Sequence, residues 1–328
     1  MSGRTRLAAA MVVVALVAAA CARLIGARGL DAAAPGATSF HTLRVDGRDR
    51  SYLLHLPPAA DSGRRVPLLL SFHGYTENAN VNMEMTRLNE VGDSLGFAVA
   101  YLNGTGKLRF AGLTWNAATC CGSAERLRIN DVAFARAVVD TLARALPVDS
   151  SRVFATGFSA GGMMSLLLAC ARPQFIYGAA DVAGAMPDTT CATRARMPVL
   201  LVRGDQDVEL EKDHDEHRHR NNHFYAVSFP GARRFWAAHN GCAQGVAVDS
   251  TPDYVLVSQL GCPAGRDVRE LIVHGQGHIW PGGVRVWAFE PRPSPNVDAS
   301  TIVASFLLDE DATARTSAAA AHAGPGSR

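Results

Sequence analysis

The sequence predicts an α/β fold in which helices cover both faces of a mostly parallel β-sheet. Short apolar runs of the kind that form buried strands alternate with stretches whose apolar residues recur at helical spacing. This alternation is typical of parallel strands joined by helical crossovers. Of the 328 residues, 48% are hydrophobic, which is enough to build a sizeable core. We therefore expect one domain over residues 40–309.

The predicted elements begin with a hairpin. Asp46-Gly47 is a turn signal between two strand-like runs at 41–45 and 51–56. Short runs predict the remaining strands, at 66–72, 97–102, 152–155, 198–202, 254–260 and 268–273. Helical spacing, or an apolar run with a small-residue start, predicts helices at 85–95, 131–145, 160–170 and 301–308. Asp131 is the expected cap of the second of these helices.

The N-terminus is typical of an exported protein. Arg4 and Arg6 precede an apolar run over residues 7–20, which ends in three alanines before Cys21. A basic start, a short apolar stretch and an Ala-x-Ala end predict an export signal over residues 1–21. The run is short for a membrane-spanning helix. We expect a secreted protein, with two alternatives: the segment stays as a membrane anchor, or Cys21 is lipidated and tethers the chain to the cell envelope.

Small residues flank the predicted domain on both sides. Residues 22–39 are rich in alanine and glycine and predict a linker. Residues 310–328 are mostly alanine, glycine and serine, which predicts a disordered tail.

The cysteine count favours disulfides. Seven cysteines, less Cys21 in the signal, leave six, and an even number in an exported chain is typical of paired cysteines. Cys242 and Cys262 both follow a glycine and flank a strand-like run, so we expect them to pair, which would stabilise the fold by about 3 kcal/mol. Cys170 and Cys191 are a second candidate pair. The adjacent Cys120 and Cys121 are expected to have different partners or to stay free.

A candidate nucleophile lies between a predicted strand and a predicted helix. Residues 157–161, Gly-Phe-Ser-Ala-Gly, match the Gly-x-Ser-x-Gly pattern. A serine on so tight a turn needs small neighbours, and the following helix start presents free N–H groups to a developing oxyanion. Ser159 is therefore the candidate nucleophile. The alternative is a glycine-rich helix entry around a buried serine.

A second turn supplies candidate oxyanion donors. His73-Gly74-Tyr75 follows the strand predicted at 66–72, where the next backbone N–H commonly faces the nucleophile. The candidate donors are the amides of Tyr75 and Ala160. We expect the His73 side chain itself to be structural.

An acid and a histidine follow in the order that this architecture uses. Residues 203–207 end a predicted strand with two carboxylates, and either Asp205 or Asp207 could hold the catalytic histidine in one tautomer. His278 lies among glycines after the last predicted strand, so a loop could carry it to Ser159. The alternative for His278 is an ordinary surface loop.

Several classes of ligand are not expected. The formal net charge is +2 without a long basic run, which argues against a nucleic-acid partner. No Cys-x-x-Cys pair supports a zinc site. Histidines 214, 217, 219 and 223 could in principle hold a metal, but this segment has almost no apolar residue to bury it, which favours a solvated loop. We expect neither metal nor cofactor.

Taken together, the motifs resemble a known family. They are His73-Gly74, Trp115-Asn116 with Cys120-Cys121-Gly122, Asn130-Asp131-Val132, the Ser159 turn, Gly204-x-x-Asp207, Asn240-Gly241-Cys242 and Gly277-His278-x-Trp280-Pro281-Gly282. Over residues 41–308 the chain resembles secreted α/β-hydrolases of the polyhydroxybutyrate depolymerase and feruloyl esterase group, which include lipoprotein esterases.

The resemblance implies roles for particular residues. The acid in the family's His-Gly-Thr-x-Asp segment maps onto Asp207, although this chain has Arg203 in place of the histidine and Asp205 in place of the threonine. The resemblance also implies that Trp115 and Trp280 line the substrate pocket, with core packing as the alternative.

The function that follows is ester hydrolysis by a Ser159-His278-Asp207 triad. The expected substrate is a short-chain or aryl ester, displayed on a polysaccharide or polyester. No long apolar insertion resembling a lipase lid lies between Ser159 and His278. Two alternatives differ in class: a secreted acyltransferase with the same triad, and a non-catalytic binding protein on the same fold.

Overall fold

The computed structural model describes residues 33–108, 110–171, 173–186, 191, 196–208, 217–218 and 225–322. The predicted export signal and most of the predicted linker lie outside these residues. The linker ends earlier than expected, because the first strand already pairs from Ala37, opposite Leu56. Within the described ranges, no helix is long and apolar enough to cross a membrane.

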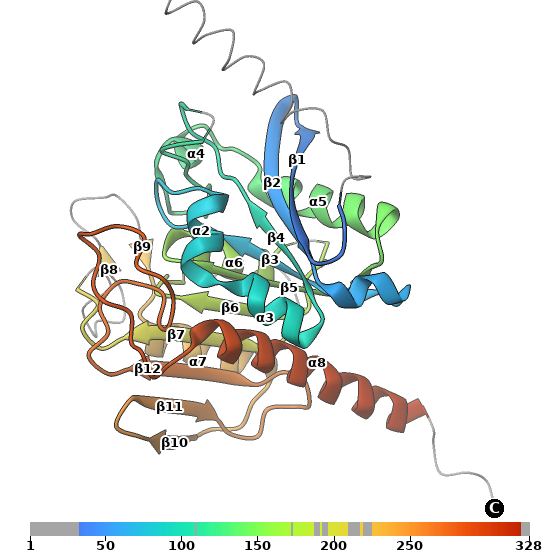
Figure 1. The fold of residues 1–328 in the computed structure, drawn as a ribbon. Coiled ribbons are helices and arrows are strands. Elements are labelled where there is room, and N and C mark those ends of the chain that lie inside the picture. Colours follow the sequence, from blue (N-terminus) through green and yellow to red (C-terminus); the bar gives the residue numbers. More distant parts are fainter. Residues whose placement is uncertain are drawn as a thin grey trace, which may run out of the picture.

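A ten-stranded sheet forms the centre of the fold, in the order β1-β2-β4-β3-β5-β6-β7-β12-β11-β10 (Figure 1). The middle strands, from β4 to β12 in that order, run parallel, and antiparallel strands extend both edges. The strands are β1 (Ala37–Val45), β2 (Arg48–Leu56), β3 (Val66–Phe72), β4 (Ala98–Leu102), β5 (Val148–Phe158), β6 (Ala179–Val182), β7 (Val199–Gly204), β10 (Val246–Ser250), β11 (Tyr254–Gln259) and β12 (Val268–Val273). A separate pair joins β8 (His217–Arg218) to β9 (Tyr225–Ala226). The expected mostly parallel sheet is confirmed.

Helices pack on both faces of this sheet (Figure 1). Side chains of α5 (Asp131–Ala145), α6 (Ala160–Ala169) and α7 (Phe229–Asn240) belong to one apolar cluster. Side chains of α2 (Ala79–Thr86), α3 (Leu88–Leu95) and α8 (Ala299–His322) belong to the other. Strand alternation separates the two, because Leu68 and Leu70 of β3 join the first cluster and Leu69 joins the second. The short η2 (Pro58–Ser62) and α4 (Gly122–Arg126) lie in connections.

The hairpin at the start of the domain forms as expected. Asp46 and Gly47 both have positive φ, 48° and 73°, which is the backbone of a type I′ turn. β1 and β2 therefore pair from Val45 and Arg48 outward.

Two helix predictions are wrong in detail. The helix expected at 85–95 is two helices, because Arg87 adopts φ 53° and interrupts the hydrogen-bond ladder between α2 and α3. Asp131 does not cap α5: the side chain of Asn130 accepts from the amide of Ala133 instead. Asp131 is buried and pairs with Arg50 at 2.6 Å.

The tail predicted at 310–328 is helical over much of its length. α8 continues to His322, because the alanines that suggested low complexity are also the strongest helix formers. Asp311 fastens this extension to the sheet through Arg152 of β5, at 2.7 Å.

Disulfides join three pairs of cysteines. Cys242 bonds Cys262, and Cys170 bonds Cys191. Cys120 bonds its neighbour Cys121, so the expectation of separate partners for these two is wrong. The peptide bond between them is cis, which places their Cα atoms only 3.1 Å apart.

Candidate active site

The candidate nucleophile sits on a tight turn between β5 and α6. Ser159 has φ 54° and ψ −119°, a conformation that L-residues rarely adopt, and its amide donates to Val182 on β6 at 2.9 Å. The turn is pressed against the end of β3, since a Cβ at Gly161 would overlap the carbonyl oxygen of Phe72. Only glycine fits there, and this close packing holds Ser159 above the carboxyl end of the sheet.

Ser159, His278 and Asp207 form one hydrogen-bonded chain. Ser159 Oγ lies 2.9 Å from His278 Nε2, and His278 Nδ1 lies 2.8 Å from Asp207 Oδ2. Asp207 is only 3% exposed. The Asp207 carboxylate can only accept a hydrogen bond, so Nδ1 of His278 must carry the proton that it donates to Asp207. Nε2 of His278 then has a free lone pair and accepts from the serine hydroxyl. The three residues follow β5, β12 and β7 respectively, and therefore meet at one edge of the sheet.

The two aspartates that the sequence left open have separate environments. Asp205 Oδ2 lies 2.9 Å from Nδ1 of His274, and Oδ1 accepts from the amide of Gly275 at 2.8 Å. Asp207 alone reaches His278. The Asp205–His274 pair is partly solvent-exposed and was not apparent from the sequence.

The turn after β3 lies against the nucleophile turn. A Cβ at Gly74 would lie 3.0 Å from the ring of Phe158, so Tyr75 follows directly beside the residue that precedes Ser159. Ala160, the other candidate donor, is the first residue of α6. The two predicted oxyanion donors therefore come from adjoining turns.

The buried side chain of His73 stabilises the turn after β3 through two hydrogen bonds. Its Nε2 accepts from the amide of Gly104 at 2.9 Å, so Nδ1 carries the proton and donates to the Gly74 carbonyl at 2.8 Å. Complete burial lowers the pKa of His73 to about 4. The ring is neutral at neutral pH and structural, as the sequence predicts for its side chain.

Comparison with known proteins identifies the family. Residues 50–207 match the family model described as "Esterase PHB depolymerase". The putative esterase NocK of Nocardia uniformis subsp. tsuyamanensis is 32% identical over 280 residues, covering 80% of this chain and 78% of that protein. The chain belongs to the PHB depolymerase family of esterases.

More distant matches include a curated esterase sequence and a solved structure. Feruloyl esterase B of Piromyces equi is 27% identical over 249 residues, covering 73% of this chain and 44% of that protein. The structure of an acetyl xylan esterase from Aspergillus awamori superposes with a TM-score of 0.52 at 15% identity, covering 74% of this chain and 94% of that one. This likeness shows the α/β-hydrolase fold.

Two tryptophans of this PHB depolymerase-family esterase do not lie where the resemblance implied. Trp115 and Trp280 are both fully buried. The indole N–H of Trp115 donates to the His73 carbonyl, and that of Trp280 donates to Ser300 Oγ, each at 2.9 Å. The expectation that they line the substrate pocket is therefore wrong, and both belong to the core. Their rings are packed inside the protein and both indole N–H groups already have hydrogen-bond partners.

An exposed aromatic pair lies on a loop that packs against the His278 loop. Trp287 and Phe289 are 45% and 84% exposed, and their rings stack at 8° with centroids 6.4 Å apart. Their loop packs on the His278 loop, since a Cβ at Gly277 would lie 2.8 Å from Pro291. The sequence offered only the aromatic residues of this loop as a signal.

A half-buried glutamate lies against the turn after β3. Glu77 Oε2 accepts from the amide of Gly74 at 2.8 Å. Burial raises the pKa of Glu77 to about 7, the Gly74 hydrogen bond opposes this rise, and the charges of Glu290 and His278 act on it in opposite directions. Glu77 therefore lies within electrostatic reach of His278. Sequence reasoning missed it because its position depends on three separate loops.

A fully buried acid, Asp181, lies beneath the triad. Asp181 of β6 is fully buried, and a Cβ at Gly162 of α6 or at Gly184 after β6 would overlap its carboxyl. Burial raises the pKa of Asp181 to about 8. The amide of Gly184 and the nearby charge of His278 oppose the rise, and Asp207 adds to it.

Asp181 should make the stability of the esterase fall as pH rises. The folded state binds the Asp181 proton more tightly than the unfolded chain, so its stabilising effect is complete below the ordinary aspartate pKa and is lost towards pH 8. Asp181→Asn has no such proton to lose, and should raise the free energy of unfolding at about pH 8 by about 1–3 kcal/mol while changing it little at about pH 4. Denaturant melts of this variant and of the exposed control Asp61→Asn measure the effect. Equal pH dependence in the two variants would contradict the role of Asp181.

No group of histidine, cysteine, aspartate and glutamate side chains suited to a metal ion occurs among the described residues. The side chains of the histidine-rich segment at 213–223 lie outside the described part of the chain.

Proposed function

We propose that this chain is an exported carboxylic ester hydrolase that acts through Ser159, His278 and Asp207. The observation that carries the proposal is the continuous hydrogen-bonded chain from the serine hydroxyl to a buried carboxylate. Its position after a Gly-x-Ser-x-Gly turn, in a chain of an esterase family, supports the same chemistry.

The geometry gives each residue a role in two half-reactions. Ser159 Oγ attacks the ester carbonyl carbon while His278 Nε2 takes its proton, and the C–O bond to the alcohol then breaks as His278 returns that proton to the leaving oxygen. Water, deprotonated by His278, attacks the acyl-enzyme and releases the acid and the free serine. Asp207 orients the imidazole and stabilises its charged form.

The oxyanion is assigned to the amides of Tyr75 and Ala160. The close packing of Gly74 on Phe158 supports this assignment, because it brings both turns to the same side of Ser159. One such donor is typically worth about 3–4 kcal/mol of transition-state stabilisation. No step of this mechanism uses a metal or cofactor.

Export is supported by the leader-like N-terminus and by the disulfides. Disulfides persist in oxidising compartments, and three pairs are formed within the described residues. The segment that would carry the signal or a lipid at Cys21 lies outside the described residues.

The proposed substrate is a short-chain or aryl ester carried on a polymer. The exposed pair Trp287 and Phe289 offers a flat apolar platform on the loop that packs against the His278 loop, and such a platform suits an aromatic acyl group or a sugar ring. The names of the related feruloyl esterase and acetyl xylan esterase point to the same class.

A panel of four esters tests this substrate class. We expect kcat/KM to be highest for methyl ferulate, p-nitrophenyl acetate or a hydroxybutyrate oligomer, and lowest for p-nitrophenyl palmitate. A preference of tenfold or more for the palmitate ester, about 1.4 kcal/mol in the transition state, would make the protein a lipase. An absence of hydrolysis of all four would remove the proposed function.

The aromatic platform can be tested separately. Replacing both Trp287 and Phe289 by alanine should lower kcat/KM for methyl ferulate about five- to tenfold, and lower it less for p-nitrophenyl acetate, which lacks an aromatic acyl group. Tyr177→Ala is the control, because Tyr177 is exposed just before β6, at the opposite edge of the sheet. An equal loss on both substrates would show that the pair does not recognise the acyl group.

A further inference from the structure

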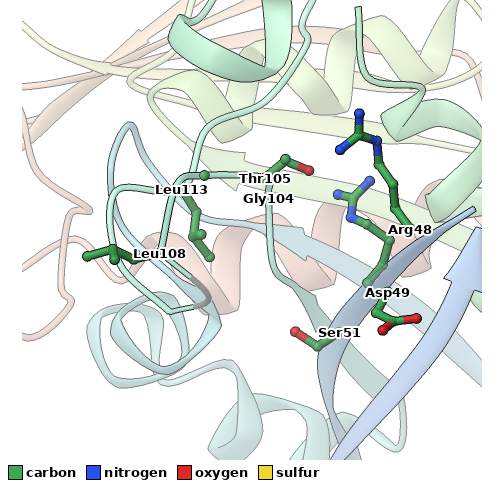
Figure 2. Close-up of a pocket in the computed structure, with 9 residues that line it drawn as sticks. Arg48, Asp49, Ser51, Gly104, Thr105, Leu108 and Leu113 are labelled. Carbon is green, nitrogen blue, oxygen red and sulfur yellow. The ribbon is translucent and has the colours of Figure 1, made fainter. Parts of the chain in front are cut away.

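A polar cavity of about 320 Å³ opens at the start of β2, outside the triad (Figure 2). Its walls are the first residues of β2 and the loop that follows β4. Figure 2 shows Arg48 and Ser51 on the strand side and Thr105 and Leu113 on the loop side. This volume lies at the lower end of the range of small-molecule sites, which is about 300–1000 Å³.

Arg48 is the unpaired charge of this cavity. Arg50, the other guanidinium of the lining, is held by Asp131 at 2.6 Å, and the lining carboxylate of Asp49 is held by Arg44 at 3.0 Å. Arg48 is exposed and has no hydrogen bond or ion pair to any described residue. Its charge also acts on Arg50, whose pKa is lowered first by burial and further by Arg48. An anion beside Arg48 would relieve this repulsion.

A second hollow strengthens the positive character of this region. It measures about 190 Å³, shares Arg48 and Arg50 with the first, and adds Arg128. Arg48 therefore lines both hollows together with Arg50, and Arg128 adds a third guanidinium to the smaller one.

The cavity also offers hydroxyl groups to a ligand. Thr105 lines it, and the Thr105 hydroxyl is buried without a hydrogen-bond partner among the described residues. In Figure 2 this oxygen points towards the strand that carries Arg48. Ser51 and Asp49 are also among the lining residues. A ligand with both an anionic group and hydroxyl groups fits this set, because the guanidinium pairs with the anion and Thr105 gains a missing partner.

The cavity and the triad lie along the same edge of the sheet. Ser159 follows the carboxyl end of β5, and Arg48 lies beyond the carboxyl end of β4, because β2 runs antiparallel to β4. The strand order β2-β4-β3-β5 places three strand spacings, about 14 Å, between them. The loop that carries Leu113 is joined to the turn after β3, since the amide of Thr76 donates to the Leu113 carbonyl at 2.9 Å. One extended ligand could therefore run from Ser159 past Tyr75 to Arg48.

We propose that this cavity binds a carboxylate-bearing sugar unit, of the hexuronate class, in the polymer whose ester is cleaved at Ser159. The proposal rests on the ester hydrolysis proposed above and adds the polymer's charge to it. Arg48 pairs with the sugar carboxylate, and Thr105 accepts from or donates to a ring hydroxyl.

Binding of glucuronate tests the site directly, with glucose as the control sugar that lacks the carboxylate. Calorimetric or NMR titration of the wild-type protein should show glucuronate binding at least about tenfold more tightly than glucose, and more weakly as salt is added. Arg48→Gln should remove most of this difference. Arg64→Gln is the matched control: it removes an exposed arginine just before β3, at the opposite edge of the sheet, and should leave glucuronate binding at the wild-type level. Equal binding of the two sugars, or equal effects of the two variants, would overturn the proposal.

A kinetic comparison links the cavity to the triad. The ratio of kcat/KM on an acetylated oligogalacturonate to that on an acetylated neutral xylo-oligosaccharide should fall about tenfold in Arg48→Gln and stay at the wild-type value in Arg64→Gln. Hydrolysis of p-nitrophenyl acetate by the same wild-type preparation shows independently whether the esterase function stands. Normal hydrolysis with an unchanged ratio in Arg48→Gln would reject the anionic subsite alone.

Discussion

Replacing Ser159 by alanine should lower kcat/KM for p-nitrophenyl acetate by several orders of magnitude, on the order of 10⁵-fold, because a triad acts as a unit and loses nearly all its effect with any one member. The residual rate should still exceed that of water, since the amides of Tyr75 and Ala160 remain. His278 and Asp207 keep their own hydrogen bond in the variant.

The fold of this variant should be unchanged. Ser159 uses its backbone amide, not its side chain, to bond Val182, and alanine is no larger than serine. We expect a melting temperature within about 2 °C of the wild type, as for a substitution that removes no buried packing. Ser62→Ala, an exposed serine in η2, is the control for the assay. Retention of more than about a hundredth of the activity in a folded Ser159→Ala protein would sink the nucleophile assignment.

Local sequence signals were sufficient where a segment's own residues decide its structure. Asp46-Gly47 predicts its hairpin because few other residues accept two positive φ angles in succession. The mostly apolar run 66–72 predicts β3 to the residue, because a strand buried on both faces needs apolar residues on both sides. The residues around Ser159 predict its turn because only small neighbours fit against β3.

Other features depend on partners that are distant in sequence. β6 was missed because its residues, Ala-Ala-Asp-Val, have little intrinsic strand preference and form a strand only between β5 and β7. β10 was missed because all five of its residues are exposed and show no alternation. The sequence predicts a capping role for Asp131 because it cannot show the partner Arg50, which lies 81 residues earlier.

In the candidate site, too, residues with a local sequence signal were predictable and residues that depend on distant partners were not. Spacing and order identified Ser159 and His278, but Asp205 and Asp207 remained equivalent until the family resemblance selected one. Trp115 and Trp280 were misplaced because large aromatic residues near a site are as common beneath it as within it. Burial and distance, which only the folded chain provides, separate these cases.

The two aspartates after β7 should respond very differently to the same substitution. Asp207→Asn should lower kcat about 10³- to 10⁴-fold, because an amide in place of the carboxylate can donate to His278 Nδ1 and so move the ring proton to Nε2, where it blocks acceptance from Ser159. The amide also carries no charge to stabilise the imidazolium that forms during the reaction. Burial of Asp207, at 3% exposure, leaves no room for water to take over this role.

Asp205→Asn should cost less than about threefold in kcat, because it makes the same chemical change outside the triad. An asparagine oxygen can still accept from the amide of Gly275, so the loop that carries His278 stays tied to β7. What is lost is the charge facing His274, and that pair is more than a third exposed on both sides, where an ion pair contributes little. Rates of p-nitrophenyl acetate hydrolysis by the two folded variants decide the matter. A larger loss in Asp205→Asn than in Asp207→Asn would assign the catalytic acid to Asp205 and would make the 2.8 Å contact between Asp207 and His278 structural only.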